Sequence, residues 1–124
     1  MHEVSSPARV PASKVRRRIE TADGGFEVGI AIDAASHGSD VLLGLQWVAP
    51  GTEVVSWRAG DATHEVYHVI QGRLRLTWDG DDAGAEDLAA GDSFFFPPAR
   101  GYSVECLGDE SAFVVWAMTP SSEG

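Results

Sequence analysis

Short apolar runs alternate with turn-forming residues along most of this sequence. The runs are rich in valine, leucine, phenylalanine and tryptophan, and pairs such as Pro50-Gly51 and Gly91-Asp92 separate them. Turn signals that recur about every eight to twelve residues are typical of antiparallel sandwiches and barrels. We therefore expect eight strands, at residues 26–32, 41–48, 53–58, 65–71, 73–78, 93–96, 102–107 and 112–118.

The clearest alternation lies in residues 73–78, where Leu74 and Leu76 are separated by polar residues. The run ends at Asp79-Gly80, a favoured tight-turn pair, so one face of this strand is expected to meet solvent. No 18-residue helical pattern competes with the strands. The sequence therefore predicts an all-β fold with an antiparallel sheet arrangement.

The chain of 124 residues is long enough for one domain and too short for a second core. Proline and the absence of periodicity mark residues 1–20 as a flexible basic arm. We expect the barrel in residues 21–119 and a tail in residues 120–124.

Charge is divided unevenly between the arm and the rest of the chain. Five of the nine basic residues lie in the first twenty positions, whereas residues 21–124 carry 17 acidic residues against four basic ones. Such an acidic body repels phosphate backbones, so we expect no nucleic-acid partner. The arm is interpreted as a solvated tail or as a segment that lies on a partner subunit.

Two further features bear on the environment of the protein. No apolar run approaches the roughly 20 residues needed to span a bilayer, and residues 1–19 lack a signal-peptide pattern. We expect a cytoplasmic protein with no membrane partner. The single cysteine, Cys106, excludes an internal disulfide and a cysteine-based zinc site, and we expect it to pack in the core.

Two segments between residues 41 and 118 carry glycines at regular spacings from a glutamate or a proline. In the first, Glu65 is followed by six residues and Gly72, after an opening at Pro50-Gly51. In the second, Gly91 is followed by five residues and Pro97. Together they resemble the paired motifs of the cupin superfamily. The resemblance implies a single small jelly-roll barrel, in which Gly51, Gly72 and Gly91 lie at turns.

The metal ligands of that family are mostly missing from this chain. The two histidines of the first motif fall on Arg58 and Gly60, or on Ala59 and Asp61, and the histidine of the second falls on Tyr102. Only Glu65 is kept. A divalent metal needs three or four converging ligands, so we expect no metal and no other cofactor.

An alternative ligand set stays open. His64 precedes the strand at residues 65–71 and can swing inward, which leaves a set of His64, Glu65, Tyr102 and Asp61 for a metal-dependent dioxygenase. His68 faces away from Glu65 because side chains alternate along a strand.

The resemblance also implies which side chains line the inside of the barrel. It directs Glu65, Tyr67 and Tyr102 inward and gives Arg58 an inward ligand position. An aromatic cavity with a few polar groups is the usual make-up of an organic-ligand pocket. We expect the catalytic residues to be Glu65, Tyr102 and Arg58, and the substrate-binding residues to be Tyr67, Trp47, Trp57, Trp116 and His64.

These side chains suit acid–base chemistry without a metal. Burial would raise the pKa of Glu65, whereas pairing with Arg58 would lower it, and both alternatives are open at this point. The tyrosines can donate hydrogen bonds to a carbonyl or enolate oxygen, and Arg58 can grip a carboxylate. We expect a homodimeric enzyme of specialised metabolism, an isomerase, cyclase or dehydratase acting on an oxygenated, partly apolar molecule. The alternatives are the dioxygenase and a binding module without catalytic activity.

Overall fold

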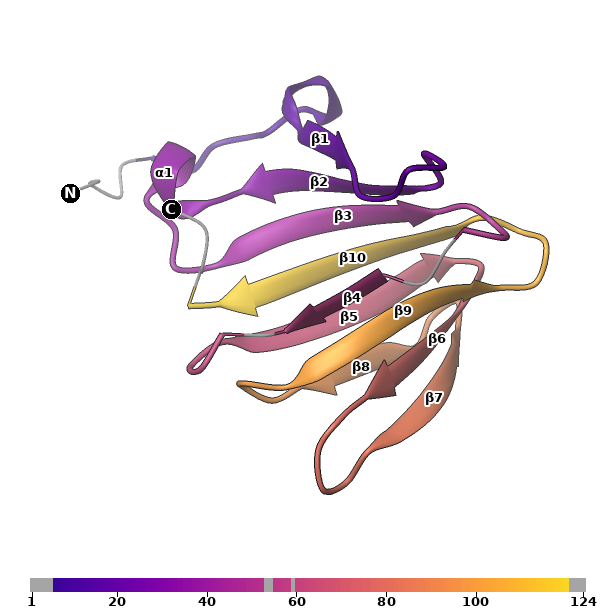
Figure 1. Ribbon diagram of the computed structural model, residues 1–124. Coiled ribbons are helices and arrows are strands. Elements are labelled where there is room, and N and C mark those ends of the chain that lie inside the picture. Colours follow the sequence, from indigo (N-terminus) through magenta and orange to yellow (C-terminus); the bar gives the residue numbers. More distant parts are fainter. Residues whose placement is uncertain (1–5, 53–54, 59, 121–124) are drawn as a thin grey trace.

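Two antiparallel sheets face each other and form a jelly-roll barrel (Figure 1). The computed structural model describes residues 6–52, 55–58 and 60–120. The larger sheet has the strand order β1-β2-β3-β10-β5-β8, and the smaller sheet has the order β4-β9-β6-β7. The strands are β1 (Arg16–Ile19), β2 (Phe26–Ile32), β3 (Leu42–Val48), β4 (Val55–Arg58), β5 (His64–Gln71), β6 (Arg73–Trp78), β7 (Gly84–Ala89), β8 (Ser93–Phe96), β9 (Gly101–Leu107) and β10 (Ala112–Thr119).

The core lies between the two sheets and follows the alternation of the strands. In β3, β5 and β9, every second residue is buried and the residues between them are more exposed. Fully burying one large apolar side chain stabilises a fold by roughly 1.5–3 kcal/mol, so these inward rows hold the two layers together. The largest fully buried apolar side chains are Phe26, Phe96, Leu42, Leu74, Leu76, Val48, Val69, Val104 and Val114.

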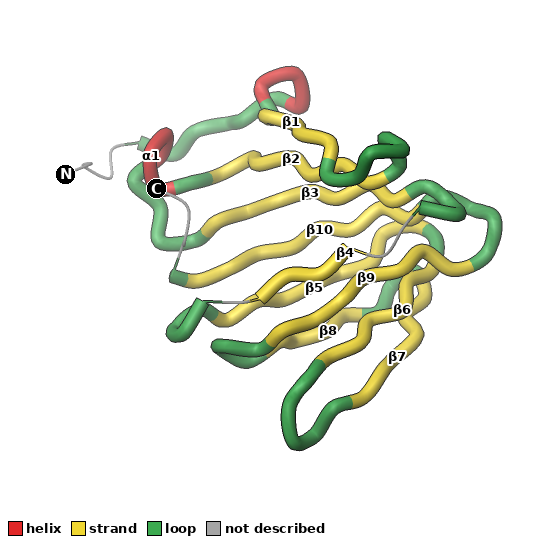
Figure 2. Tube along the Cα trace, viewed as in Figure 1, coloured by secondary structure: helices red, strands yellow, loops and turns green. Residues whose placement is uncertain are grey.

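The structure confirms the predicted fold class and each of the eight predicted strands. Their ends agree to within one residue, except that residues 53–54 of the strand predicted at 53–58 lie outside the described residues. The tube in Figure 2 shows these strands joined mostly by short loops and turns. Cys106 is buried, as expected.

Two strands were not predicted, and both lie at a sheet edge. Every residue of β1 is exposed, and β7 buries only Leu88. Neither segment shows apolar alternation, because an edge strand is held by hydrogen bonds to one neighbour and needs little burial of its own. As a result, part of the predicted arm of residues 1–20 belongs to the larger sheet.

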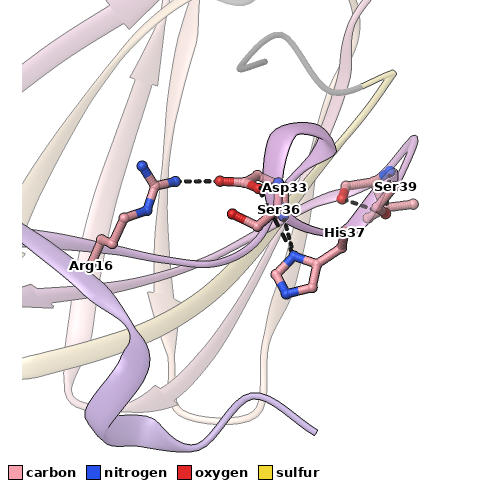
Figure 3. A network of polar contacts seen from close by, with 6 residues as sticks. Arg16, Asp33, Ser36, His37 and Ser39 are labelled. Atoms are coloured by element: carbon pink, nitrogen blue, oxygen red, sulfur yellow. Dashed lines mark hydrogen bonds and ion pairs between the residues drawn. The ribbon is translucent and has the colours of Figure 1, made fainter. Parts of the chain in front are cut away.

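A polar network joins β1 to the short helix α1 (Ala34–His37) and is drawn in Figure 3. Arg16 on β1 forms an ion pair with the buried carboxylate of Asp33. Asp33 also caps the helix, since its Oδ1 accepts a hydrogen bond from the backbone N–H of Ser36 at 2.7 Å. That hydrogen bond is the main reason why the pKa of Asp33 is lowered, and the charge of Arg16 adds to it. The network anchors β1 against the barrel.

The three glycines expected at turns adopt the left-handed backbone region. Gly51, Gly72 and Gly91 have φ values of +75°, +79° and +95°. At Gly72 a Cβ atom would also lie 2.7 Å from the backbone oxygen of Ser111. The turn between β5 and β6 therefore requires glycine. The part of the chain that the structure describes contains no helix with the length and apolar character needed to cross a membrane.

Candidate active site

A cavity of about 170 Å³ opens between the two sheets. The larger sheet contributes Gln46 from β3, Glu65 and Tyr67 from β5 and Trp116 from β10, and the smaller sheet contributes Tyr102 from β9. These side chains point inward because each occupies a buried position in its alternating strand. The apolar wall is completed by Val28, Leu42, Trp57 and Met118, and the exposed Arg18 and Arg58 also line the cavity.

Glu65 and Tyr102 form the polar centre of the cavity. Glu65 is only 2% exposed, and its Oε1 accepts a hydrogen bond from the Tyr102 hydroxyl at 2.6 Å. The two residues come from opposite sheets, so this hydrogen bond joins the layers across the cavity. Burying a carboxylate in an apolar barrel destabilises the fold unless the carboxylate is hydrogen-bonded. The hydrogen bond from Tyr102 to Oε1 of Glu65 offsets part of this loss.

Burial raises the pKa of Glu65 to about 7, and the hydrogen bond from Tyr102 opposes this rise only in part. Arg58 is exposed, and it forms no ion pair with Glu65 among the residues that the structure describes. Of the two alternatives, the structure therefore favours the raised pKa. A carboxyl group with a pKa near neutrality can both accept and donate a proton at physiological pH.

Tyr67 extends this polar centre toward β3. Its hydroxyl donates to Oε1 of Gln46 at 3.3 Å, and its ring packs edge-on against Tyr102 with 6.1 Å between ring centroids. Burial raises the pKa of both tyrosines, and the neighbouring Glu65 raises them further. Both hydroxyls therefore stay protonated and act as hydrogen-bond donors.

The structure brings together most of the predicted site residues. Arg58, Glu65, Tyr67, Tyr102, Trp57 and Trp116 all line the cavity. Trp57 is partly buried and packs against Tyr102, with 5.9 Å between ring centroids.

Two predicted site residues lie outside the barrel. His64 is exposed and stacks on Phe95 with ring centroids 5.8 Å apart, because it precedes the inward-facing Glu65 on β5. Trp47 stacks on Phe113, and the Arg17 guanidinium lies 3.8 Å from the centroid of its ring. The expected inward positions of His64 and Trp47 are therefore corrected by the alternation of their strands.

Gln46 is a cavity residue that the sequence analysis did not single out. It is a polar residue in a strand whose inward positions also include Leu42 and Val48. The opposite face of this strand is apolar as well, so alternation alone did not show that Gln46 points inward.

The side chains at the family's ligand positions do not fit a divalent metal. Arg58 carries a positive charge at one of these positions, and Gly60 offers no side-chain ligand at the next. In the other alignment Asp61 is exposed, and Ala59 lies outside the described residues. Across the described parts of the chain, no three histidine, cysteine, aspartate or glutamate side chains gather as a metal site would require. We therefore derive no chemical step through a metal.

Comparisons with known proteins agree with the jelly-roll barrel. A cupin domain model matches residues 44–118. Mn(II)-containing oxalate decarboxylase from Bacillus subtilis superposes with a TM-score of 0.69 at 30% identity, over 86% of this chain and 28% of that chain. This chain thus spans little more than a quarter of the length of that enzyme. No curated protein sequence matches the chain closely enough to count as a relative.

A second solved structure shares the fold over nearly its whole length. KdgF from Halomonas sp. superposes with a TM-score of 0.72 at 15% identity, and the match covers 95% of this chain and 97% of that chain. At this identity the likeness concerns the fold alone. The family model covers more than half of the sequence, including Glu65, Gly72 and Gly91. The chain therefore belongs to the cupin family.

Proposed function

We propose that this cupin is a metal-free enzyme that transfers protons to and from a small oxygenated, partly apolar molecule held in the barrel cavity. One observation carries the proposal: a buried carboxyl group with a pKa of about 7 lines a cavity that both sheets share. Titratable groups with strongly shifted pKa values concentrate where proton transfer is catalysed.

Ionised Glu65 is the base of the proposed reaction. It removes a proton from the carbon next to a substrate carbonyl. The electron pair of the C–H bond forms a carbon–carbon double bond, and the π pair of the carbonyl moves onto its oxygen. Once Glu65 is neutral, it is a weaker acceptor for the Tyr102 hydroxyl at 2.6 Å, which can turn its O–H toward the enolate oxygen. If the enolate is conjugated with a carbon–carbon double bond, return of the proton from Glu65 to the far end of that system completes an isomerisation. If the substrate carries a hydroxyl group on the β-carbon, the enolate expels it, and this group takes the proton from Glu65 and leaves as water, which completes a dehydration.

Hydrogen–deuterium exchange tests this proposal without knowledge of the natural substrate. Small ketones and oxo acids are incubated in D₂O, and NMR follows exchange at the carbon next to the carbonyl. We expect exchange with the wild-type protein, and a loss of about 10²–10⁴-fold in rate in Glu65→Gln, as for the removal of a general base. Tyr102→Phe is expected to slow exchange as well.

The control variant is His68→Ala, since His68 lies on the outer face of the same strand and bonds to Ser93. Its exchange rate is expected to equal that of the wild type. Equal rates in Glu65→Gln and the wild type would refute the proposal. Ligand binding with no exchange at all would favour the alternative of a binding module.

The proposal includes a homodimer formed through the outer face of the larger sheet. Val66, Ile70 and Phe95 are 48%, 49% and 52% exposed, and Val66 and Phe95 are directly paired across β5 and β8. Covering adjacent exposed apolar side chains favours association. Light scattering is expected to give twice the chain mass at micromolar concentration, and a Phe95→Glu variant is expected to shift it toward the monomer. A wild-type protein that stays monomeric would refute this part.

A further inference from the structure

Two buried hydrogen-bond donors in the cavity are left without a partner among the residues that the structure describes. They are Nε2 of Gln46 and Nε1 of Trp116, whose residues are only 1% and 7% exposed. Both side chains line the cavity that holds Glu65. A buried donor without a partner destabilises a fold, so a pair of them in one cavity indicates a group that binds there.

The surrounding residues hold the Trp116 donor in place. Trp116 lies opposite Gly44 on the neighbouring strand β3. A Cβ atom on Gly44 would lie only 2.0 Å from Cζ2 and 2.1 Å from Cε2 of the indole ring. Because Gly44 has no side chain, the indole of Trp116 can pack directly against the backbone of β3, and this position fixes its Nε1.

The Gln46 donor is held in place through the other end of its amide. The Tyr67 hydroxyl donates to Oε1 of Gln46, which leaves the NH₂ group for a ligand. Gln46 and Trp116 lie on adjacent strands, since Gln46 is paired with Val114, two residues from Trp116 on the same face. Side chains in this diagonal relation are within reach of one shared ligand group.

The remaining polar groups of the cavity indicate the charge of the ligand. Arg58 lines the cavity yet is exposed, which places it at the open side, and it forms no ion pair among the described residues. Arg18, also exposed, lines the same cavity. A guanidinium at the entrance recognises a carboxylate well, because its planar fork matches the two oxygens.

The volume of the cavity limits the size of the ligand. A buried cavity of about 150 Å³ accommodates benzene, with its six carbon atoms. At about 170 Å³, this cavity takes roughly six to eight non-hydrogen atoms inside the barrel.

We propose that the ligand is a short oxo carboxylate, whose carbonyl oxygen accepts hydrogen bonds from Gln46 Nε2 and Trp116 Nε1 while its carboxylate faces Arg58. This inference rests on the proposed function and assigns it a substrate class. The carbonyl group is the one that Glu65 would enolise, and the same two donors would stabilise the charge that develops on its oxygen.

Four probes of similar chain length separate the two recognition elements. The oxo acids 4-oxopentanoate and 2-oxopentanoate carry both groups, pentanoate lacks the ketone, and 2-pentanone lacks the carboxylate. We expect at least one oxo acid to bind the wild-type protein tenfold or more tightly than pentanoate and 2-pentanone, measured by calorimetry. The indole N–H resonance of Trp116 is expected to shift with the oxo acid and not with pentanoate.

Variants then assign each contact. Trp116→Phe keeps a ring and removes the N–H, so it should weaken oxo acid binding about tenfold and leave pentanoate binding unchanged. Arg58→Gln should reduce the affinity for the oxo acid and not for 2-pentanone. The matched controls are Trp47→Phe on the outer face and Arg75→Gln, whose side chain pairs with Asp87 on the smaller sheet, and neither should change binding.

Several outcomes would overturn the inference. These are equal affinity for the oxo acids and pentanoate, equal affinity for the oxo acids and 2-pentanone, or no binding of any oxo acid. If the oxo acids bind as expected but Glu65→Gln does not slow deuterium exchange, the substrate class stands and the proposed catalysis fails. If exchange depends on Glu65 with neutral ketones alone, the catalysis stands and this inference fails.

Discussion

The two faces of strand β5 differ sharply although their residues alternate along one segment. Glu65 and Tyr67 face the cavity, are buried and take part in hydrogen bonds there. His64 and Val66, their immediate neighbours in sequence, are exposed on the outer face. Burial raises the pKa of Glu65 to about 7, whereas His64 stacks on Phe95 away from the cavity. Whether a residue of β5 belongs to the site therefore depends on the face of the strand it occupies, and not on how close it lies to Glu65 in sequence.

The largest expected effect is a difference in the rate of proton exchange between a variant of the inner face and a variant of the outer face. Glu65→Gln should lower the rate of proton exchange by about 10²–10⁴-fold, because a positioned base is removed. His64→Ala on the outer face should leave the rate within twofold of the wild type. A large loss in His64→Ala would show that the outer face takes part in the chemistry.

Stability should depend on pH through Glu65 in a direction opposite to that of most carboxylates. The pKa of Glu65 rises from about 4.5 to about 7 on folding, so the folded protein holds this proton more tightly than the unfolded chain. Its contribution therefore favours folding below about pH 4.5 and is lost as the pH rises through about 7. Relative to Glu65→Gln, the wild type should lose roughly 3 kcal/mol of unfolding free energy between pH 4.5 and 8.

Urea unfolding of both proteins across this pH range measures the difference. Glu86→Gln, which removes an exposed carboxylate on β7, serves as the control and should follow the wild-type curve. Asp33, whose pKa is lowered, adds the usual loss of stability in acid to all three proteins and cancels from the comparison. A constant difference between wild type and Glu65→Gln at all pH values would contradict the raised pKa.

Gly44→Ala tests how tightly the indole of Trp116 packs against the inner face of β3. The new methyl group would overlap the indole, so we expect a loss of about 1–3 kcal/mol in the free energy of unfolding, as for overpacked cores. A displaced indole should also weaken oxo acid binding. Leu45→Ala, next to Gly44 but on the outer face of β3, is the control and should leave oxo acid binding unchanged. Unchanged stability and binding in Gly44→Ala would show that the indole is not tightly seated.

The smallest expected effect concerns metal content, which should be the same in the wild type and in a variant of the outer face. The purified protein should carry far less than one divalent ion per chain, and His64→Ala should not change this value, because His64 faces away from Glu65. Elemental analysis provides the measurement. About one iron, manganese, nickel or zinc ion per chain, lost in Glu65→Gln, would restore the dioxygenase alternative.

Most of the barrel could be predicted from local patterns in the sequence. Alternation and turn residues located eight strands, most of which have a glycine or proline at or next to one end. The same alternation, together with the cupin resemblance, directed Glu65, Tyr67 and Tyr102 inward, and all three line the cavity. These features depend on strand geometry and on burial, and both leave a periodic pattern of apolar residues in short segments of the sequence.

The placement of Trp47 could not be predicted, because it depends on how the two sheets pack. Strand β3 is apolar on both faces, with Leu42 and Val48 inside and Leu43 and Leu45 outside, so periodicity does not distinguish its inner face. The edge strand β1 was missed for a related reason, because its three arginines are held by pairing with β2 and not by burial.

The chemistry of the cavity also depended on contacts between residues far apart in the sequence. Whether burial or Arg58 would control the pKa of Glu65 was open until the structure placed Arg58 at the exposed side and Tyr102 within 2.6 Å. The unpartnered donors of Gln46 and Trp116 became visible only when strands β3, β5 and β10 lay side by side. Desolvation and hydrogen-bond satisfaction are properties of the packed neighbourhood, and distant segments of the chain create that neighbourhood together.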